Sequence, residues 1–324
     1  MNKNIVIVGL GQLGSRHLQS VASVKETCEV YIVDPSMTNV NRAVIRFKQM
    51  PGWDKHSLHT LTSIEDLSLS FIDVLIISTN SNVRKSIVKH FLLSTKLRYV
   101  ILEKFLFQSH VEYDEISLIL FDKKNVRVFV NCPRRLNEQY QKIAEYLRES
   151  KETFHMEVDG SNWGLGCNGI HFIDLFSFFT GQTNIKWISR LDNEILQSKR
   201  DGYIEFTGKM YGIDCKGNMI SLASSFDNSK AISIKVSNSR FTLTIDEDLH
   251  VSKRINGELE ETYPINLRLQ SELTSQVIEQ LFRESSCNLT PYSESAALHK
   301  NYLTALLTHY QDVKNVNIEK CPIT

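Results

Sequence analysis

The chain opens with the feature that most limits its fold. The apolar run Ile5–Val8 leads directly into the glycine spacing G-x-G-x-x-G at positions 9–14, and a helical pattern follows. The first glycine permits a tight turn, the second lets the backbone approach a pyrophosphate, and the third lets helix pack closely on strand. Free N–H groups at the start of that helix attract phosphate. The residues predicted to bind a dinucleotide here are Gly9, Gly11, Gln12, Leu13 and Gly14.

An acidic residue closes the next apolar run. Val30–Val33 ends in Asp34, in the position that follows the glycine loop in dinucleotide-binding units. A carboxylate at this strand end accepts hydrogen bonds from both ribose hydroxyls and repels a 2′-phosphate, so the pattern favours NAD over NADP. No arginine immediately follows Asp34 to reverse that preference. The predicted cofactor is therefore NAD, with NADP as the less favoured alternative.

The overall composition argues against several classes of function. Lysine plus arginine and aspartate plus glutamate each number 37, so no net charge is available to capture nucleic acid or an anionic membrane. The six cysteines form neither a C-x-x-C pair nor a zinc spacing, which is typical of reduced thiols, and we predict no metal site. No leader pattern opens the chain, and no apolar stretch approaches the ~18 residues of a membrane span. We expect a cytoplasmic protein that acts on small molecules.

Two kinds of pattern divide the chain. Over residues 1–131, apolar runs at 71–77 and 98–102 alternate with helical stretches such as 82–93, which predicts a doubly wound parallel sheet of the Rossmann type. From about 186 to 255, alternating polar and apolar runs separated by turn residues predict an open, mostly antiparallel sheet with one wet face. The predicted domains are an NAD-binding Rossmann domain at 1–131 and an α+β domain for substrate binding and oligomerisation at 132–324.

Three short motifs resemble one enzyme family. Glu103-Lys104-Phe105, at the end of a predicted parallel strand, looks like the E-K-P motif of the glucose-fructose oxidoreductase / inositol dehydrogenase (Gfo/Idh/MocA) family, with phenylalanine in place of proline. Residues 169–174 look like its G-x-H-x-x-D segment, which we expect to open a helix at about residue 170. Ser78-Thr79-Asn80 matches the turn that passes beneath the nicotinamide ribose. The resemblance implies an oxidoreductase with a Rossmann domain followed by a helix-backed open sheet.

The resemblance also implies catalytic roles. Lys104 lies at the carboxyl end of a parallel strand, where ligands gather in open α/β sheets, and it is the predicted acid/base, with His171 assisting. Histidine titrates near neutral pH, and Asp174 shares its helical face. The alternatives are a solvated surface lysine and a core histidine. The further residues predicted to bind cofactor in this region are Ser78, Thr79, Asn80, Glu103 and Lys104 itself, with Glu103 orienting the lysine or the backbone.

One departure from the family pattern affects the predicted proton relay. The acidic residue that the family commonly carries four positions before the histidine is Cys167 here, with Asn168 beside it. Either Lys104 and His171 form the relay alone, or Asn168 positions the substrate, or the activity is altered. The residues predicted to bind substrate are Asn168, Asp174, Arg134, Arg135 and Trp163; solvated charges at a domain junction and a core tryptophan are the alternatives. Arg84 stands where relatives often have histidine, and no role is assigned to it.

These inferences predict an NAD-dependent oxidoreductase. Hydride would pass between nicotinamide and a secondary alcohol or ketone of a carbohydrate-like substrate, and the pair Arg134–Arg135 favours a nucleotide-linked or acidic sugar. Two alternatives remain: an NAD-dependent glycosidase of the same architecture, and a non-catalytic NAD- or sugar-sensing protein, which the cysteine at 167 would suit. A bare antiparallel face also predicts a homo-oligomer, a dimer or a tetramer.

Overall fold

The computed structural model describes residues 2–227, 230–247 and 250–324, and it divides into two compact units. The first contains the chain up to Phe107 together with Val111–Pro133 and Arg268–Tyr292; the second contains Gln108–His110, Arg134–Leu267 and Ser293–Thr324. The predicted single boundary therefore differs from the observed division, because the chain returns to the first unit late. Within the described residues, no helix has the length and apolar character needed to cross a bilayer.

The first unit is built on a seven-stranded sheet with the order β17-β6-β5-β4-β1-β2-β3. All its neighbouring strands pair parallel except β17, which pairs antiparallel with β6. Its strands are β1 (Lys3–Val8), β2 (Cys28–Val33), β3 (Ser57–Leu61), β4 (Phe71–Ile77), β5 (Lys96–Leu102), β6 (Arg127–Val130) and β17 (Thr290–Pro291). The parallel, doubly wound architecture predicted from the alternating pattern is confirmed.

Helices on both faces bury the central strands of this sheet. From Ile72 to Ile77, β4 is buried throughout, as a parallel strand covered on both sides must be. The α-helices are α1 (Gln12–Val21), α2 (Met37–Lys48), α3 (Ser81–Ser94), α4 (His110–Phe121) and α7 (Gln270–Glu284), with short 3₁₀ helices at Trp53–Lys55 and Ile64–Asp66. A further 3₁₀ helix, Pro133–Leu136, begins where the chain passes into the second unit. Strand order reverses between β1 and β4, so their carboxyl ends form the switch point at which such sheets bind ligands.

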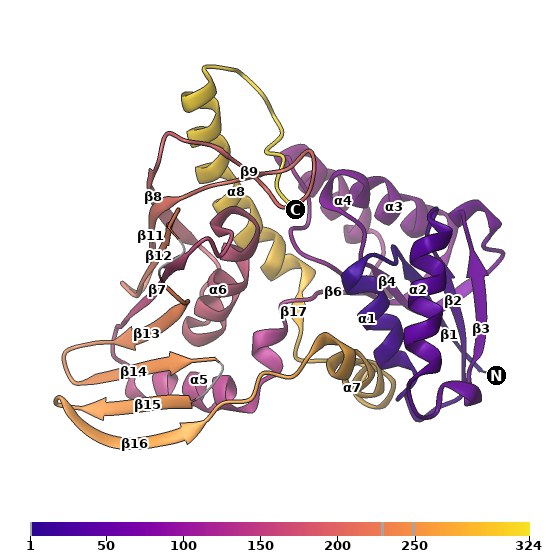
Figure 1. Ribbon diagram of the computed structural model, residues 1–324, viewed down its shortest axis with the longest axis horizontal. Coiled ribbons are helices and arrows are strands. Elements are labelled where there is room, and N and C mark those ends of the chain that lie inside the picture. The colour runs from indigo at the N-terminus through magenta and orange to yellow at the C-terminus, as the bar shows by residue number, and fades with distance from the viewer. Residues whose placement is uncertain (1, 228–229, 248–249) are drawn as a thin grey trace. The chain divides into compact units, whose positions relative to one another are not determined.

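The late return of the chain completes the first unit. Helix α7 packs on α1, beside it in Figure 1, and β17 adds to the sheet edge by pairing Thr290 with Val130. Ser20 on α1 accepts a hydrogen bond from the Ser275 backbone N–H at 2.9 Å. A two-residue strand gives no periodic signal in sequence, so the pattern that predicted the domain boundary did not reveal this return.

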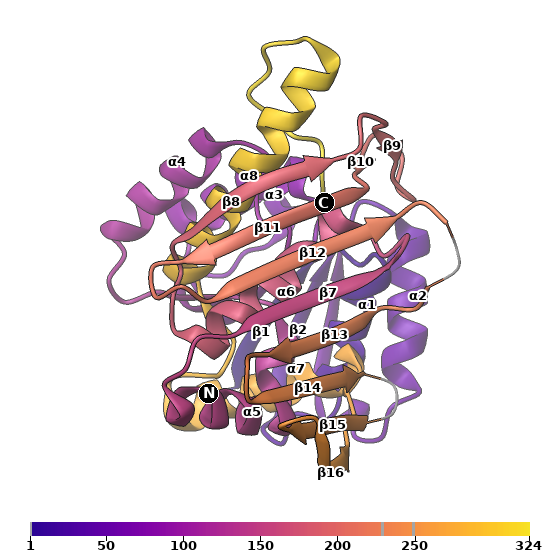
Figure 2. The ribbon, with the colours of Figure 1, turned by 90° about the vertical axis from the view of Figure 1, so that its left-hand side faces the viewer.

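The second unit contains an eight-stranded sheet with the order β16-β15-β14-β13-β7-β12-β11-β8, displayed face-on in Figure 2. Only β7 and β12 pair parallel, so the predicted open, mostly antiparallel sheet is confirmed. The strands are β7 (His155–Ser161), β8 (Ile185–Leu191), β11 (Gly208–Asp214), β12 (Met219–Ser225), β13 (Ser233–Ser237), β14 (Phe241–Asp246), β15 (His250–Ile255) and β16 (Glu258–Pro264), with a separate short pair, β9 (Leu196–Gln197) and β10 (Ile204–Glu205).

Three α-helices accompany this sheet: α5 (Glu138–Ser150), α6 (Leu165–Thr180) and α8 (Tyr292–Lys314). Alternate residues of β11 are buried, from Met210 to Asp214, which leaves the other face of that strand exposed. Helix α6 begins at Leu165 rather than at about residue 170. The early start follows from Gly164, which adopts a left-handed conformation (φ 76°) and turns the chain directly from β7 into the helix.

Candidate active site

The glycine loop lies at the switch point of the first unit and closes against two neighbouring strand ends. The Gly9 N–H donates to the Val33 carbonyl at 2.9 Å, and Gly9 has a φ of 87°, a conformation that favours glycine. Helix α1 begins at Gln12 with Gly11 as its N-cap and no side-chain cap. The first N–H groups of the helix therefore have no partner within the helix and suit an anion.

The three glycines of the loop differ in why they must be glycine. A Cβ on Gly14 would lie 1.8 Å from the Gly9 carbonyl oxygen, and a Cβ on Gly9 would lie 2.8 Å from Cγ2 of Thr79. Protein packing alone requires both of these glycines. A Cβ on Gly11 would meet no described protein atom within 4 Å, and Gly11 has an ordinary φ of −56°. The fold leaves this position open, as the approach of a pyrophosphate to the backbone requires.

Asp34 supports the glycine loop through its hydrogen bonds. Its Oδ2 accepts from the Leu10 N–H at 2.6 Å, while Oδ1 accepts from the Ser36 N–H at 2.8 Å and from Asn39 at 3.2 Å. The side chain is only 6% exposed. Arg42 donates to Asn39 at 2.8 Å, and Asn39 in turn donates to Asp34. An arginine is therefore linked to the carboxylate through Asn39, although none follows Asp34 directly in sequence.

The turn after β4 contacts the glycine loop directly. The Ser78 hydroxyl donates to the Gly9 carbonyl at 2.6 Å, and its N–H donates to the Val8 carbonyl at 2.9 Å. The Thr79 hydroxyl oxygen is buried without a hydrogen-bond partner among the described residues. A buried hydroxyl in that state needs a partner from outside the protein. This orphaned oxygen and the open space at Gly11 both fit a dinucleotide. Asn80 is exposed at the N-cap of α3.

Glu103 and Lys104 have different surroundings. Glu103 is 3% exposed and accepts hydrogen bonds from His17 at 2.8 Å and Asn131 at 2.5 Å. Burial alone would raise the pKa of Glu103, but these hydrogen bonds and the His17 charge outweigh it and hold that pKa below its usual range. Lys104 is half-buried at the end of β5, and its peptide bond to Phe105 is cis. The predicted roles of both residues stay predictions.

Arg84 is a residue that the sequence left without a role. Its side chain is 2% exposed and donates to three backbone carbonyls, those of Thr79, Phe105 and Leu106. It therefore ties the turn after β4 to the segment that follows Lys104. Only its position, where relatives carry histidine, could have drawn attention to it.

Replacing Arg84 by methionine should destabilise the protein by about 3 kcal/mol, because it leaves up to three buried carbonyls without donors. The urea midpoint measures this. Arg98→Met is the matched control, since that guanidinium stacks on Tyr99 at 5.0 Å and is partly exposed. Equal midpoints for both variants would show that Arg84 does not hold the two segments together.

In the second unit, α6 contains three of the six predicted site residues, Asn168, His171 and Asp174. Because the helix begins at Leu165, Cys167 and His171 are separated by one turn and share a face. His171 is half-buried. The Asn168 side chain donates to the Trp163 carbonyl at 2.7 Å, which closes the turn into the helix.

A carboxylate from a different element lies at the start of α6. Glu205, on β10, accepts from the backbone N–H groups of Gly166 at 2.8 Å and Cys167 at 3.2 Å, and the Cys167 thiol bonds to it as well. Burial raises the pKa of Glu205, although these hydrogen bonds oppose the shift. The turn of α6 that holds Cys167 therefore does have an acid beside it. No sequence motif links Glu205 to this turn, so sequence reasoning missed it.

The two arginines predicted to bind substrate are both engaged within the second unit. Arg135 donates to Asp174 at 2.8 Å, and Asp174 is 1% exposed, so these two predicted substrate residues form a buried ion pair with each other. Arg134 makes a bidentate contact with Glu247, both distances being 2.7 Å, and lies over the Phe172 ring at 4.4 Å. These pairs link the start of the second unit to α6 and β14. A substrate role for them stays a prediction.

The Trp163 side chain packs inside the second unit. It is 6% exposed, its indole N–H donates to the Ala223 carbonyl at 2.7 Å, and its ring meets Phe172 edge-on at 5.4 Å. Stacking of a sugar on Trp163 stays a prediction. Among the described residues, no group of three or more His, Cys, Asp or Glu side chains is arranged to hold a metal ion.

Comparison with solved structures finds the same fold over nearly the whole chain. An oxidoreductase from Agrobacterium radiobacter, solved with NAD⁺, L-tartaric acid and magnesium, matches with a TM-score of 0.75 at 12% identity over 97% of each chain. A scyllo-inositol dehydrogenase from Lactobacillus casei, with NAD(H) and scyllo-inositol, matches at 0.70 and 15% over 96% of this chain and 98% of that one. A UDP-N-acetylglucosamine 3-dehydrogenase from Acidithiobacillus ferrooxidans matches at 0.69 and 14% over 94% and 97%.

Sequence comparison finds a family model for the first part of the chain. No curated protein matches the chain. Residues 3–132 match the family model described as oxidoreductase family, NAD-binding Rossmann fold, which covers the glycine loop, Asp34 and Lys104. This match shows that residues 3–132 are similar to the Gfo/Idh/MocA oxidoreductase family, and the solved structures show that nearly the whole chain shares their fold.

Proposed function

We propose that the protein is an NAD-dependent oxidoreductase that interconverts a secondary alcohol and a ketone on a carbohydrate-like substrate. The observation that carries this proposal is the glycine loop at the switch point, where the backbone at Gly11 has open space for a pyrophosphate and the Thr79 hydroxyl lacks a partner among the described residues. Gln12 and Leu13 supply backbone N–H groups to the phosphates, and Asp34 accepts from the adenosine ribose. Ser78 holds the loop closed by its bond to Gly9.

When bound, the cofactor supplies or accepts the hydride. The chain manages the proton. The Lys104 amine takes the hydroxyl proton of the alcohol, or returns it to the oxygen of the ketone, and His171 assists by exchanging that proton. Glu103, held ionised by His17 and Asn131, fixes the backbone next to Lys104.

The substrate class follows from the neighbours and from this proton chemistry. The neighbouring proteins are described with L-tartaric acid, with scyllo-inositol and as acting on a UDP-linked sugar, all of which carry secondary hydroxyls. Asn168 and His171, both half-buried on α6, give the second unit polar groups for such a substrate. A screen of sugar acids, cyclitols and nucleotide sugars, followed by NADH absorbance, tests the proposal; no turnover with any of them, in protein that binds NAD⁺, would contradict it.

Two alternative functions predict different results in the same substrate screen. An NAD-dependent glycosidase would cleave a glycoside with no net change in NADH. A sensing protein would bind NAD or a sugar without converting it, and Cys167 at the usual acidic position favours this alternative. The carboxylate of Glu205 beside Cys167 weakens that case, because an acid does lie at this turn of α6.

Asp34 should set the cofactor preference. We expect Asp34→Asn to reduce the preference for NADH over NADPH by about tenfold, because a neutral amide no longer repels a 2′-phosphate. Asparagine is a better test than alanine, since its oxygen can still accept from Leu10 or Ser36. Isothermal titration of both cofactors measures the ratio of dissociation constants.

Asp73→Asn is the matched control for this experiment. Asp73 is also a buried carboxylate of the first unit, 5% exposed and bonded to the Asn4 N–H at 2.9 Å, but it lies at the amino end of β4. It should leave the cofactor ratio unchanged. If both variants changed the ratio equally, the preference would reflect general loss of stability rather than the carboxylate at the end of β2.

We also propose that the protein is a homo-oligomer and that a second copy covers the exposed face of its antiparallel sheet. Ile188 on β8 and Tyr211 on β11 are cross-strand partners, 65% and 37% exposed, and Ile213 adds a further exposed apolar side chain. Light scattering at micromolar concentration should give a mass at least twice that of the 37.2 kDa chain. Ile188→Lys should lower it, and a monomeric mass for the unaltered protein would contradict the proposal.

A further inference from the structure

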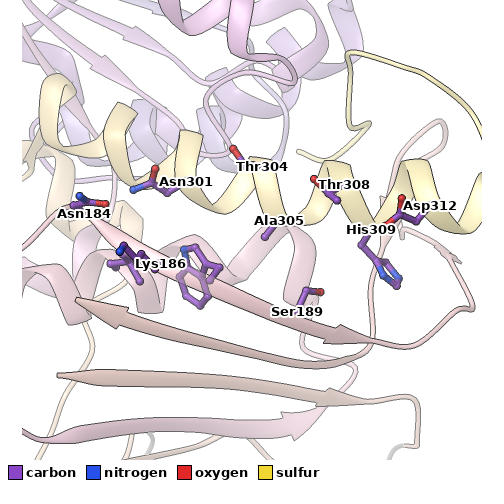
Figure 3. A pocket seen from close by; sticks show the side chains of 11 residues that line it. Asn184, Lys186, Ser189, Asn301, Thr304, Ala305, Thr308, His309 and Asp312 are labelled. Atoms are coloured by element: carbon purple, nitrogen blue, oxygen red, sulfur yellow. The ribbon is translucent and has the colours of Figure 1, made fainter. Parts of the chain in front are cut away.

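A groove runs between α8 and β8, the edge strand of the second unit's sheet. It has a volume of about 560 Å³ and is lined entirely by residues of that unit, none of which belongs to the predicted reaction site. In Figure 3 the side chains of Asn301, Thr304 and Thr308 project from α8, and Ser189 projects from the strand below. A volume in this range is typical of small-molecule sites.

The groove exists because α8 turns a polar, short-chained face toward the strand. Asn301, Thr304, Ala305 and Thr308 recur at helical spacing and line the gap, whereas Tyr302, Leu303, Leu306 and Leu307 of the same helix are buried. A helix that only covered a sheet would place its apolar stripe there. The side chains on this face are too small to fill the space above β8.

Two buried polar atoms in the strand wall lack partners. The Trp187 indole nitrogen and the Ser189 hydroxyl oxygen are buried, both residues line the groove, and neither atom has a hydrogen-bond partner among the described residues. They are two residues apart on one strand, so they share a face. An indole nitrogen only donates, whereas a hydroxyl both donates and accepts. Leaving such buried groups unpaired is unfavourable, so an occupant that pairs them is favoured.

Several rim side chains are already held in place. Asn301 donates to the Thr183 carbonyl at 3.4 Å, and His309 contacts the Asp192 carbonyl at 2.9 Å. Lys186 and Asp312 carry opposite charges, so the lining has no net charge and does not favour binding of an ionic ligand. Hydroxyl and amide groups that both donate and accept match a ligand whose own groups do the same.

We propose that this groove is a binding site for a neutral polyhydroxylated molecule, a small carbohydrate, separate from the reaction site. A ligand hydroxyl oxygen accepts from the Trp187 indole N–H, and a second ligand hydroxyl pairs with Ser189. The Asn301 amide and the hydroxyls of Thr304 and Thr308 pair with the remaining hydroxyl groups of the ligand. From Asn301 to Asp312 the groove spans eleven residues of helix, or about 16 Å, which suits a chain of sugar rings.

The indole N–H signals of the protein report on this site directly. The chain has three tryptophans, Trp53, Trp163 and Trp187, and the variant Trp187→Phe identifies the signal of the third. We expect titration of the cofactor-free protein with maltotriose, up to about 50 mM, to shift the Trp187 signal saturably while the other two stay fixed. The measurement uses no cofactor and no turnover, so its outcome does not depend on the proposed oxidoreductase activity.

Matched variants separate the groove from the rest of the strand. Ser189→Ala and Thr308→Val should each weaken maltotriose binding about tenfold. Arg190→Ala, on the opposite face of the same strand, should not change it. The proposal is overturned if the Trp187 signal does not move with maltotriose, glucose or myo-inositol, which would leave water as the partner of these groups, or if it moves only with inorganic phosphate.

Discussion

Replacing Lys104 with methionine should lower kcat for the alcohol–ketone interconversion by about 10³-fold and leave the dissociation constant for NADH within about twofold. The proposed role of the amine is proton transfer to or from the substrate oxygen, which contributes only in the transition state. Methionine keeps the length and packing of the aliphatic stem at the end of β5 but carries no titratable group. Steady-state kinetics with the best substrate of the screen, together with cofactor titration, measure the two quantities.

A different lysine provides the control for this variant. Lys96 begins the same strand, is exposed, and lies at its amino end, so Lys96→Met should not change kcat. Lys104→Arg distinguishes charge from proton transfer, because arginine keeps the positive charge but does not deprotonate in proteins. If the arginine variant retained full kcat, Lys104 would contribute charge only, and the acid/base role would pass to another group.

The fold was predictable where the sequence pattern is local and strongly periodic. Strand β4 is apolar at every position except Asp73 because both its faces are buried, and β14 alternates apolar and polar residues because one of its faces is exposed. The return of residues 268–292 to the first unit was not predictable. Its contacts, such as Thr290 with Val130, join residues far apart in sequence, and no local pattern encodes such pairings.

The same distinction explains which parts of the candidate site were found. Gly9, Gly14 and Asp34 form a compact motif whose spacing carries the geometry. Arg84 acts through three backbone carbonyls that any residue types could provide, so nothing in the sequence identifies its partners. Glu205 reaches the start of α6 from a two-residue strand, and only the folded chain brings it beside Cys167. Sequence motifs therefore located the glycine loop but not the contacts of Arg84 and Glu205, which depend on how the chain folds.

Replacing Gly11 with alanine should weaken NADH binding by about 10²-fold while leaving the melting temperature within about 1 °C of the unaltered protein. The added methyl group meets no described atom of the protein, and Gly11 has a φ that alanine adopts readily, so the fold has no reason to change. The methyl group instead occupies the space that a pyrophosphate needs beside the helix start. Loss of one or two charge-assisted hydrogen bonds, about 1.5–3 kcal/mol each, gives the expected factor.

Gly14→Ala is the informative contrast, since it changes the same residue type in the same loop. A methyl group there would lie 1.8 Å from the Gly9 carbonyl oxygen and 2.6 Å from the Ser78 hydroxyl, so the loop must shift and the protein should lose several degrees of melting temperature. Calorimetry and cofactor titration on both variants separate the two effects. A Gly11→Ala protein that bound NADH as tightly as the unaltered one would mean that no phosphate approaches the loop at this point. The open space at Gly11 would then not be a cofactor site, even though the fold around it is that of a dinucleotide-binding domain.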